Sequence, residues 1–220
     1  MLSQDLTKAR LLEAAGEEFA ANGFDGATIR SICARAGAKN IAAINYHFKD
    51  KEHLYEAALL EAHECSKDRS DLSQIEGLPP EERLRTFVRG FLLNVMEKDR
   101  RNTWHDALML REMIQPSEAS DTLVRESIRP RFVFLLATLR ELCPEADDRR
   151  LHALAFSVVG QCLHYKVARP ISVRLVGDEA YGQLDPDFLT DHITTMILAA
   201  LGLAPPFCER AEVLVEKGGD

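Results

Sequence analysis

The stretch "AGAKNIAAINYHFKDKEHLY" (36–55) decides how the chain is interpreted. It begins with small apolar residues and then presents Asn45, Tyr46, His47, Lys49 and Lys51 in quick succession. A helix buried in a core would not carry these hydrogen-bond donors, and an ordinary surface helix would not begin with several alanines and two isoleucines. We therefore expect a short helix that packs by one face and offers the other face to a polar partner.

The residues before this stretch indicate two further helices. A first helix is predicted over 4–22, because Leu12, Ala15 and Phe19 recur on one helical face and Asn22-Gly23 stops the pattern. Thr28 is a predicted N-cap for a second helix over 28–35, in which Ile29, Ile32 and Cys33 face inward and which Gly37 ends. The third helix is predicted over 40–47, with Ile41, Ile44 and Phe48 on its buried side.

Three short helices with a glycine-containing turn between the second and third predict a helix-turn-helix. In this motif the third helix enters the major groove of DNA. Ala42 and Ala43 keep its outer face thin, and the Asn45 amide can pair with base edges. Tyr46, His47 and Lys51 are expected to donate to phosphates.

The charge distribution permits this interpretation. The 220-residue chain has a net charge of −8, yet residues 1–53 contain seven Lys/Arg and seven Asp/Glu. Residues 54–220 therefore carry the whole acidic excess. The first quarter of the chain is neutral, which does not exclude DNA binding.

The rest of the chain is predicted to be helical. No run of alternating β-branched residues between turns is convincing, and "ISVRLV" (171–176) stands alone. We expect a loop over 168–186, a frayed tail from Pro205, and a kink at Pro130. The predicted helices cover 50–70, 80–98, 102–115, 118–142, 146–168 and 185–202. The expected fold is all-α, with a DNA-binding domain over 1–53 and a ligand-binding and dimerisation domain over 54–220.

The segment "ATIRSICARAGAKNIAAINYHFKDKEHLYEAAL" (27–59) resembles the DNA-binding domain of the TetR family, and "NIAAINYHF" is similar to its CecR-like branch. Fainter likeness continues through 110–130 and 158–170. The resemblance implies a homodimeric repressor, a palindromic operator, and release of DNA when a small molecule binds the helical body. The positions that match DNA-contacting residues of the family are Thr28, Arg30, Asn40, Ala42, Asn45, Tyr46, His47 and Lys51.

One feature departs from the family pattern. "GAKN" (37–40) has one residue more than is usual between the turn glycine and the "NIAAINYHF" phrase. We assign the insertion to Lys39 and include this base in the predicted DNA-binding set. The extra residue is expected to be absorbed before Asn40, which then caps the third helix.

Two apolar helices near the C-terminus suit a dimer interface. The stretch 146–168 carries a wide apolar stripe with Gly160 in its middle, which suggests close approach of another helix, and 185–202 repeats the pattern. Paired with their symmetry mates, they would form a four-helix interface, which we favour over the alternative that both helices are simply core. A ligand pocket in the body is expected to use Trp104, Met109, Arg111, Met113, Phe134, Phe156, His164 and Tyr165.

Other classes are less well supported. Motifs of the forms GxSxG, GxxxxGK[ST], HExxH and GxGxxG do not occur, so an enzyme is not expected and no cofactor or metal is assigned. A redox switch through Cys65 or Cys162 is an alternative. The five cysteines form no CxxC pair, the start "MLSQDLTKARLLEAAGEEF" does not resemble a signal peptide, and no apolar run is long enough for a membrane span. We expect a cytoplasmic protein.

Overall fold

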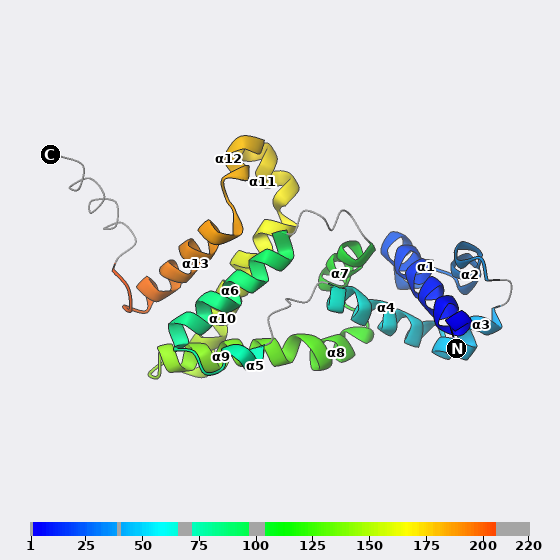
Figure 1. Ribbon diagram of the computed structural model, residues 1–220, viewed down its shortest axis with the longest axis horizontal. Helices are drawn as coiled ribbons and strands as arrows, with labels where there is room; N and C mark the ends of the chain where they lie inside the picture. The colour runs from blue at the N-terminus through cyan, green and yellow to red at the C-terminus, as the bar shows by residue number, and fades with distance from the viewer. Residues whose placement is uncertain (1, 39–40, 66–71, 97–103, 206–220) are drawn as a thin grey trace. The chain divides into compact units, whose positions relative to one another are not determined.

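The computed structural model describes residues 2–38, 41–65, 72–96 and 104–205 (Figure 1). All regular secondary structure in these ranges is helical, so the predicted all-α fold is confirmed. The chain forms two compact units, one from residues 1–67 and 98–130 and the other from 68–97 and 131–220. Each unit has its own apolar core.

The first unit is built around its N-terminal helix. Helix α1 contacts α2, α4 and α7, and its core-facing side chains include Leu11, Ala15 and Phe19. Gly16 lies on the same helix, and a Cβ there would stand only 2.2 Å from the Trp104 ring. The missing side chain therefore lets α7 pack directly on α1. The elements are α1 (Leu2–Gly26), α2 (Ile29–Ala36), α3 (Ala42–Phe48), α4 (Lys51–Cys65), α7 (Trp104–Ile114), α8 (Ala119–Leu123) and the π-helix η1 (Val124–Ile128).

The predicted stop at Asn22-Gly23 appears as a break inside α1. Gly23 has φ 72° and ψ 177°, a conformation that residues with a side chain rarely adopt. Phe24 then turns back onto the core, with its ring centroid 6.3 Å from that of Phe19 and 5.1 Å from that of Tyr55. These aromatic contacts place the start of α2 beside α1.

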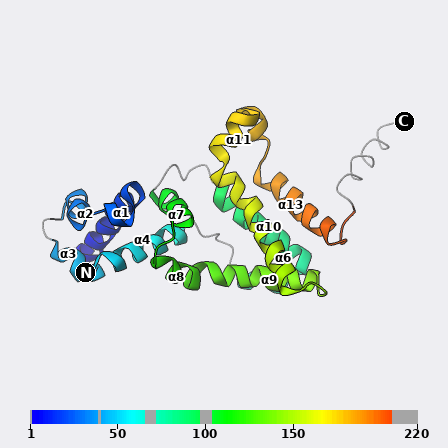
Figure 2. The same ribbon diagram turned by 180° about the vertical axis from the view of Figure 1, so that it is seen from behind.

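The second unit packs α6 against α10 and α13, which lie beside it in both views (Figures 1 and 2). Its core combines side chains of α6, α9, α10 and α13, including Leu84, Leu135, Leu151 and Ile193. The elements are α5 (Leu72–Ile75), α6 (Pro80–Met96), α9 (Arg129–Leu142) from Arg131 onward, α10 (Asp148–Val167), α11 (Arg169–Val176), α12 (Asp178–Gly182) and α13 (Pro186–Ala200).

The prediction of a loop over 168–186 is wrong, because most of that stretch is helical. Helix α11 carries a proline in its first turn and α12 follows after Gly177. None of the α11 side chains is buried. A helix that buries no face leaves no apolar periodicity in its sequence, and the β-branched residues of "ISVRLV" suggested an extended segment instead.

The long helix predicted over 118–142 changes its hydrogen-bonding pattern just before Pro130. Residues Val124–Ile128 form a π-helical turn, in which the Arg129 N–H bonds the Val124 carbonyl five residues earlier. Pro130 has no N–H to donate to the preceding turn, so the regular ladder cannot continue through it. The wider π-helical turn changes the hydrogen-bonding register of the helix just before Pro130.

Among the described residues, none makes the close helix approach predicted at Gly160. No atom of these residues lies within 4 Å of the position that a Cβ would occupy there, and Gly160 is exposed. The reason is that the buried stripe of α10 runs through Leu151, Ala155, Val158 and Cys162, and Gly160 lies off that stripe.

Candidate nucleic-acid interface

Local hydrogen bonds define both ends of α2. Thr28 has extended backbone angles, its hydroxyl accepts from the Ser31 N–H at 3.0 Å, and the Thr28 N–H donates to Ser31 Oγ at 3.3 Å. This reciprocal capping box confirms the predicted N-cap. At the other end, the N–H groups of Gly37 and Ala38 bond the carbonyls of Ala34 and Cys33, with Gly37 at φ 65°. This Schellman turn stops α2 and begins the link to α3.

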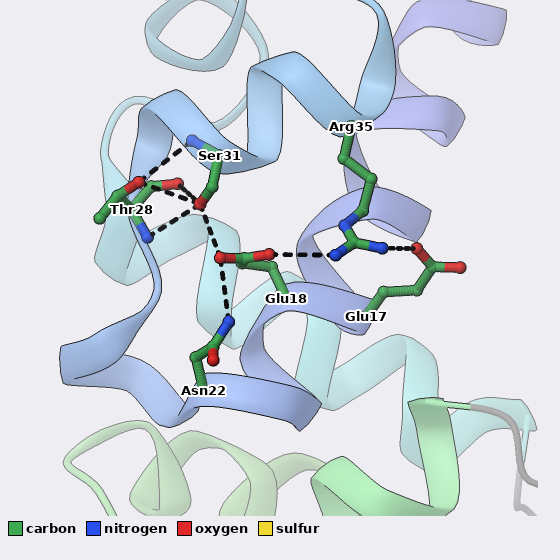
Figure 3. A network of polar contacts seen from close by, with 6 residues as sticks. All are labelled: Glu17, Glu18, Asn22, Thr28, Ser31 and Arg35. Carbon is green, nitrogen blue, oxygen red and sulfur yellow. Dashed lines mark hydrogen bonds and ion pairs between the residues drawn. The ribbon is translucent and has the colours of Figure 1, made fainter.

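A buried carboxylate holds α2 against α1 (Figure 3). Glu18 of α1 accepts from Ser31 Oγ at 2.7 Å and from Asn22 Nδ2 at 3.0 Å, and it also pairs with Arg35 at 3.4 Å. Arg35 reaches the neighbouring Glu17 at 3.0 Å. A buried carboxylate is stable only when its oxygens are satisfied, so these contacts fix both the rotation and the position of α2.

Helix α3 packs by Ile44 and Phe48 and exposes Ala42, Asn45 and Tyr46. Ile44 and Phe48, one turn apart, are buried in the core of the first unit. Asn45 is exposed, and Tyr46 is 72% exposed, so packing of Tyr46 within the chain is excluded as its main role. The Tyr46 and His47 rings meet edge to face, with centroids 4.9 Å apart. The outer face of α3 is therefore available to a partner.

The prediction that Ile41 is buried is wrong. Its side chain is 49% exposed, because α3 begins at Ala42 and Ile41 precedes the first helical turn. The buried face is carried by Ile44 and Phe48 alone, with Ala43 partly buried beside them. Ala38 is not helical, which agrees with the expectation that the longer turn is absorbed before the third helix.

The chain leaves α3 through an unusual turn. Lys49 has φ 75° and ψ −55°, and the Asp50 N–H bonds the Phe48 carbonyl at 3.0 Å. Asp50 then caps α4 by accepting from the His53 N–H at 2.9 Å. This backbone hydrogen bond, followed by the His53 side chain, lowers the pKa of Asp50. Both ends of the α3–α4 junction are therefore set by local bonds.

Helices α1 and α4 contribute basic side chains near α3 and the turn before it. The Lys51 Nζ lies 4.5 Å from the centre of the Phe24 ring, which holds this predicted phosphate ligand beside α1. Sequence reasoning missed two bases of α1. The Lys8 Nζ lies 5.8 Å from the Phe48 ring centre, and a Cβ on Gly37 would lie 3.0 Å from Arg10 Nη2. In the sequence, the one hint for Lys8 and Arg10 is that both lie on the first helix within a turn of its core residue Leu11.

The predicted DNA-binding residues that the structure describes all lie in the first unit, on α2, α3 and their flanks. Thr28, Arg30, Ala42, Asn45 and Tyr46 are exposed, whereas His47 and Lys51 are half-buried. Lys39 and Asn40 lie outside the described residues, so the predicted Asn40 cap does as well.

The predicted ligand-binding residues are divided between the two units. Four belong to the first unit, where Trp104 is buried, Met109 packs against the core, and Met113 is exposed. Arg111 of this group bonds the Ala21 carbonyl at 3.4 Å. The other four belong to the second unit, and they are Phe134, Phe156, His164 and Tyr165. In that unit Phe134 stacks on Phe87, Phe156 stacks on Phe132, and His164 contacts Ser172 and Tyr165.

The structure bears on the other classes of site as well. Burial raises the pKa of the Cys162 thiol to about 12, which disfavours the reactive thiolate. In the described ranges, no three His, Cys, Asp or Glu side chains are grouped as metal ligands. None of the described helices has the length and hydropathy needed to cross a membrane.

Comparison with known proteins agrees with the geometry. Residues 11–58 match the model of the bacterial regulatory proteins of the TetR family, and residues 80–201 match the C-terminal domain of the HTH-type transcriptional dual regulator CecR. No curated protein is a significant sequence match.

Solved structures share the fold at low identity. AibR, in complex with isovaleryl coenzyme A and operator DNA, is 20% identical with a TM-score of 0.60, covering 91% of this chain and 100% of its own. The hemolysin II regulator HlyIIR is 20% identical with a TM-score of 0.53, covering 90% and 97%. A protein assigned to regulation of fatty acid metabolism in Clostridium perfringens is 23% identical with a TM-score of 0.58, covering 86% and 97%.

The second family model alone spans more than half of the chain, and the first lies over the helix-turn-helix described above. Members of this family regulate transcription and are not enzymes. The chain therefore belongs to the TetR family of DNA-binding transcriptional regulators, in its CecR-like branch.

Proposed function

We propose that the chain is a ligand-responsive repressor that binds a palindromic operator as a homodimer. The observation that carries the proposal is the outer face of α3, where Ala42, Asn45 and Tyr46 are exposed while Ile44 and Phe48 anchor the helix. Amide side chains read adenine edges in the major groove, and the small alanine lets the backbone approach. Residues 1–53 would read DNA, and residues 54–220 would bind ligand and dimerise.

Basic side chains of α1, α2 and α4, together with His47, support the proposed contacts to phosphates. Arg30, Lys51 and His47 belong to the predicted set, and we add Lys8 and Arg10 because both lie beside the turn or the end of α3. Such contacts determine register on the duplex rather than sequence preference. Selection from a pool of randomised duplexes tests the proposal, since a dimeric reader should enrich an inverted repeat with half-sites about 34–36 Å apart. Enrichment of no sequence would contradict it.

Exposed apolar groups on α10 and α13 support the proposed homodimer. Phe156 of α10 is 64% exposed, and Phe188 and Met196 of α13 are exposed as well. Open space at Gly160 permits a partner helix to come close to α10. The inner faces of the same helices are occupied by the core, so the pairing would use the outer faces through residues 146–168 and 185–202.

The effector is proposed to be an acyl-coenzyme A or a related carboxylic acid derivative. The support is that AibR, which shares the fold over most of both chains, was solved with isovaleryl coenzyme A. A series of acyl-coenzyme A thioesters of increasing chain length, titrated into the complex with the selected operator, tests this. An effector must bind the DNA-incompetent state more tightly, so one member should release the DNA. Retention of DNA with every member would exclude this ligand class.

A further inference from the structure

A buried carboxylate joins three helices of the first unit. Glu112 of α7 is 3% exposed, and its Oε2 accepts from the Tyr55 hydroxyl of α4 at 2.7 Å. Its Oε1 accepts from the Ser117 N–H at 2.9 Å, from Ser117 Oγ at 2.7 Å and from Ser120 Oγ of α8. Each carboxylate oxygen is therefore satisfied, and each bonds a different segment of the chain.

The surroundings of Glu112 and Tyr55 favour the protonation state of each that makes their hydrogen bond. Burial raises the pKa of Glu112, but the hydrogen bonds from Ser120, Tyr55 and Ser117 outweigh burial and the net pKa is lowered. Burial and the neighbouring Glu112 both raise the pKa of Tyr55. At neutral pH the carboxylate is thus ionised and the phenol is protonated, which is the combination that makes a strong hydrogen bond.

The cluster lies where the DNA-reading helices meet the chain that leads to the second unit. Tyr55 is in the first turns of α4, directly after the α3–α4 junction, and its ring packs edge to face on Phe19 at 4.8 Å. Ser117 and Ser120 are at the start of a helical stretch that continues through η1 into α9. A change that draws these serines away from the carboxylate would also loosen the support of α4.

We propose that Glu112 and Tyr55 are positioning residues, whose hydrogen bond holds α4, and with it α3, in the orientation that binds DNA. The proposal rests on the proposed function as a DNA-binding regulator. Both side chains are buried and cannot contact a partner directly, so their effect is on the fraction of molecules that are competent to bind. A smaller competent fraction raises the apparent Kd by the same factor for every DNA sequence.

The test compares Tyr55→Phe with the matched control Tyr181→Phe. Tyr181 is a buried tyrosine of the second unit whose hydroxyl donates to the Tyr165 carbonyl at 3.2 Å, so its variant also loses one buried hydroxyl. Affinity for the selected operator and for a scrambled duplex is measured at several salt concentrations, with circular dichroism to show that each variant is folded. Tyr55→Phe should lower the affinity for both duplexes by the same factor, about tenfold, and leave the salt dependence of binding unchanged. Tyr181→Phe should bind like the wild type.

The outcomes separate this proposal from the proposed function. Failure of the wild type to bind any selected duplex overturns the proposed function. Normal affinity of folded Tyr55→Phe, a loss confined to the operator, or an equal loss in the control overturns the positioning role instead. Should Tyr55→Phe not fold, Ser120→Ala is measured in its place. Ser120→Ala removes one donor to Glu112 and should lower the affinity for both duplexes by one common factor. Normal affinity of this variant overturns the proposal.

Discussion

Lys49 carries a backbone conformation that its side chain disfavours. The three-residue turn from Phe48 to Asp50 places Lys49 at φ 75° and ψ −55°, a turn that is rare and strained for residues with a Cβ. Strain of this kind persists only where the surroundings demand it. Here the demand comes from Phe48, which must stay in the core, and from Asp50, which must cap α4.

Lys49→Gly should relieve this strain and raise the free energy of unfolding by about 1 kcal/mol. Chemical denaturation at pH 7 measures the change. Lys49→Ala is the matched control, because it removes the same charge but keeps the Cβ. Equal stability of the two variants would show that the turn is not strained.

Asn45 and Lys51 are predicted to contribute to DNA binding in different ways. Lys51→Ala should weaken operator and random DNA together and reduce the salt slope by about one, because one phosphate contact is lost. Asn45→Ala should weaken binding to the operator by about 1–3 kcal/mol and binding to random DNA much less. Titrations of both variants against both duplexes at several salt concentrations distinguish the roles, and an unchanged salt slope for Lys51→Ala would remove it from the phosphate set.

At the scale of the element, α2 depends on its first hydrogen bonds, since eight residues are few for a stable helix. Thr28→Ala removes the hydroxyl that caps Ser31 and should cost about 1 kcal/mol of unfolding free energy. Thr28→Ser keeps the hydroxyl and should retain most of the stability. Thermal unfolding of both variants is the measurement, and similar losses in the two would contradict the capping role.

The attachment of α4 to α7 and α8 should be sensitive to acid. The pKa of Glu112 is lower in the folded state, so its bonds contribute stability above the usual carboxyl pKa, and that contribution disappears as pH falls through the folded value. The wild type should therefore be more stable than Glu112→Gln at pH 7 and lose this advantage below about pH 4.5. Glu118→Gln, an exposed change in the same segment, should leave the pH profile unaltered.

At the scale of the whole molecule, the dimer proposal depends on the open space at Gly160. A Cβ at position 160 would have no atom of the described residues within 4 Å, so the Gly160→Leu protomer should fold, whereas a partner helix packed on α10 would be displaced. Sedimentation should show a mass of twice 24.7 kDa for the wild type and a shift toward 24.7 kDa for the variant. Gly160→Ala is the control and should remain dimeric with a more stable helix. A monomeric wild type would refute the dimer.

Most helices and the exposed face of α3 follow from local sequence, because caps, glycines and apolar spacing act within a few residues. Thr28, Gly37 and the pair Ile44 and Phe48 each determine structure that their neighbours already indicate. The cluster around Glu112 could not be found this way, since Tyr55 lies 57 residues from it and no pattern marks the pairing. Helix α11 was missed because it buries no side chain.

The capped ends of the segment from Thr28 to Asp50 have a consequence for protein engineering. Its first helix is started by a side chain within the segment, and its last residue caps the following helix, so neither boundary depends on distant sequence. Within the segment, Ile32, Cys33, Ala36, Ile44 and Phe48 join the core of the first unit, and Ser31 and Arg35 bond Glu18 of α1. A segment exchanged as a cassette between related regulators must therefore keep these anchoring residues, whereas the exposed positions of α3 can be randomised to seek new DNA specificities without redesign of the supporting helices.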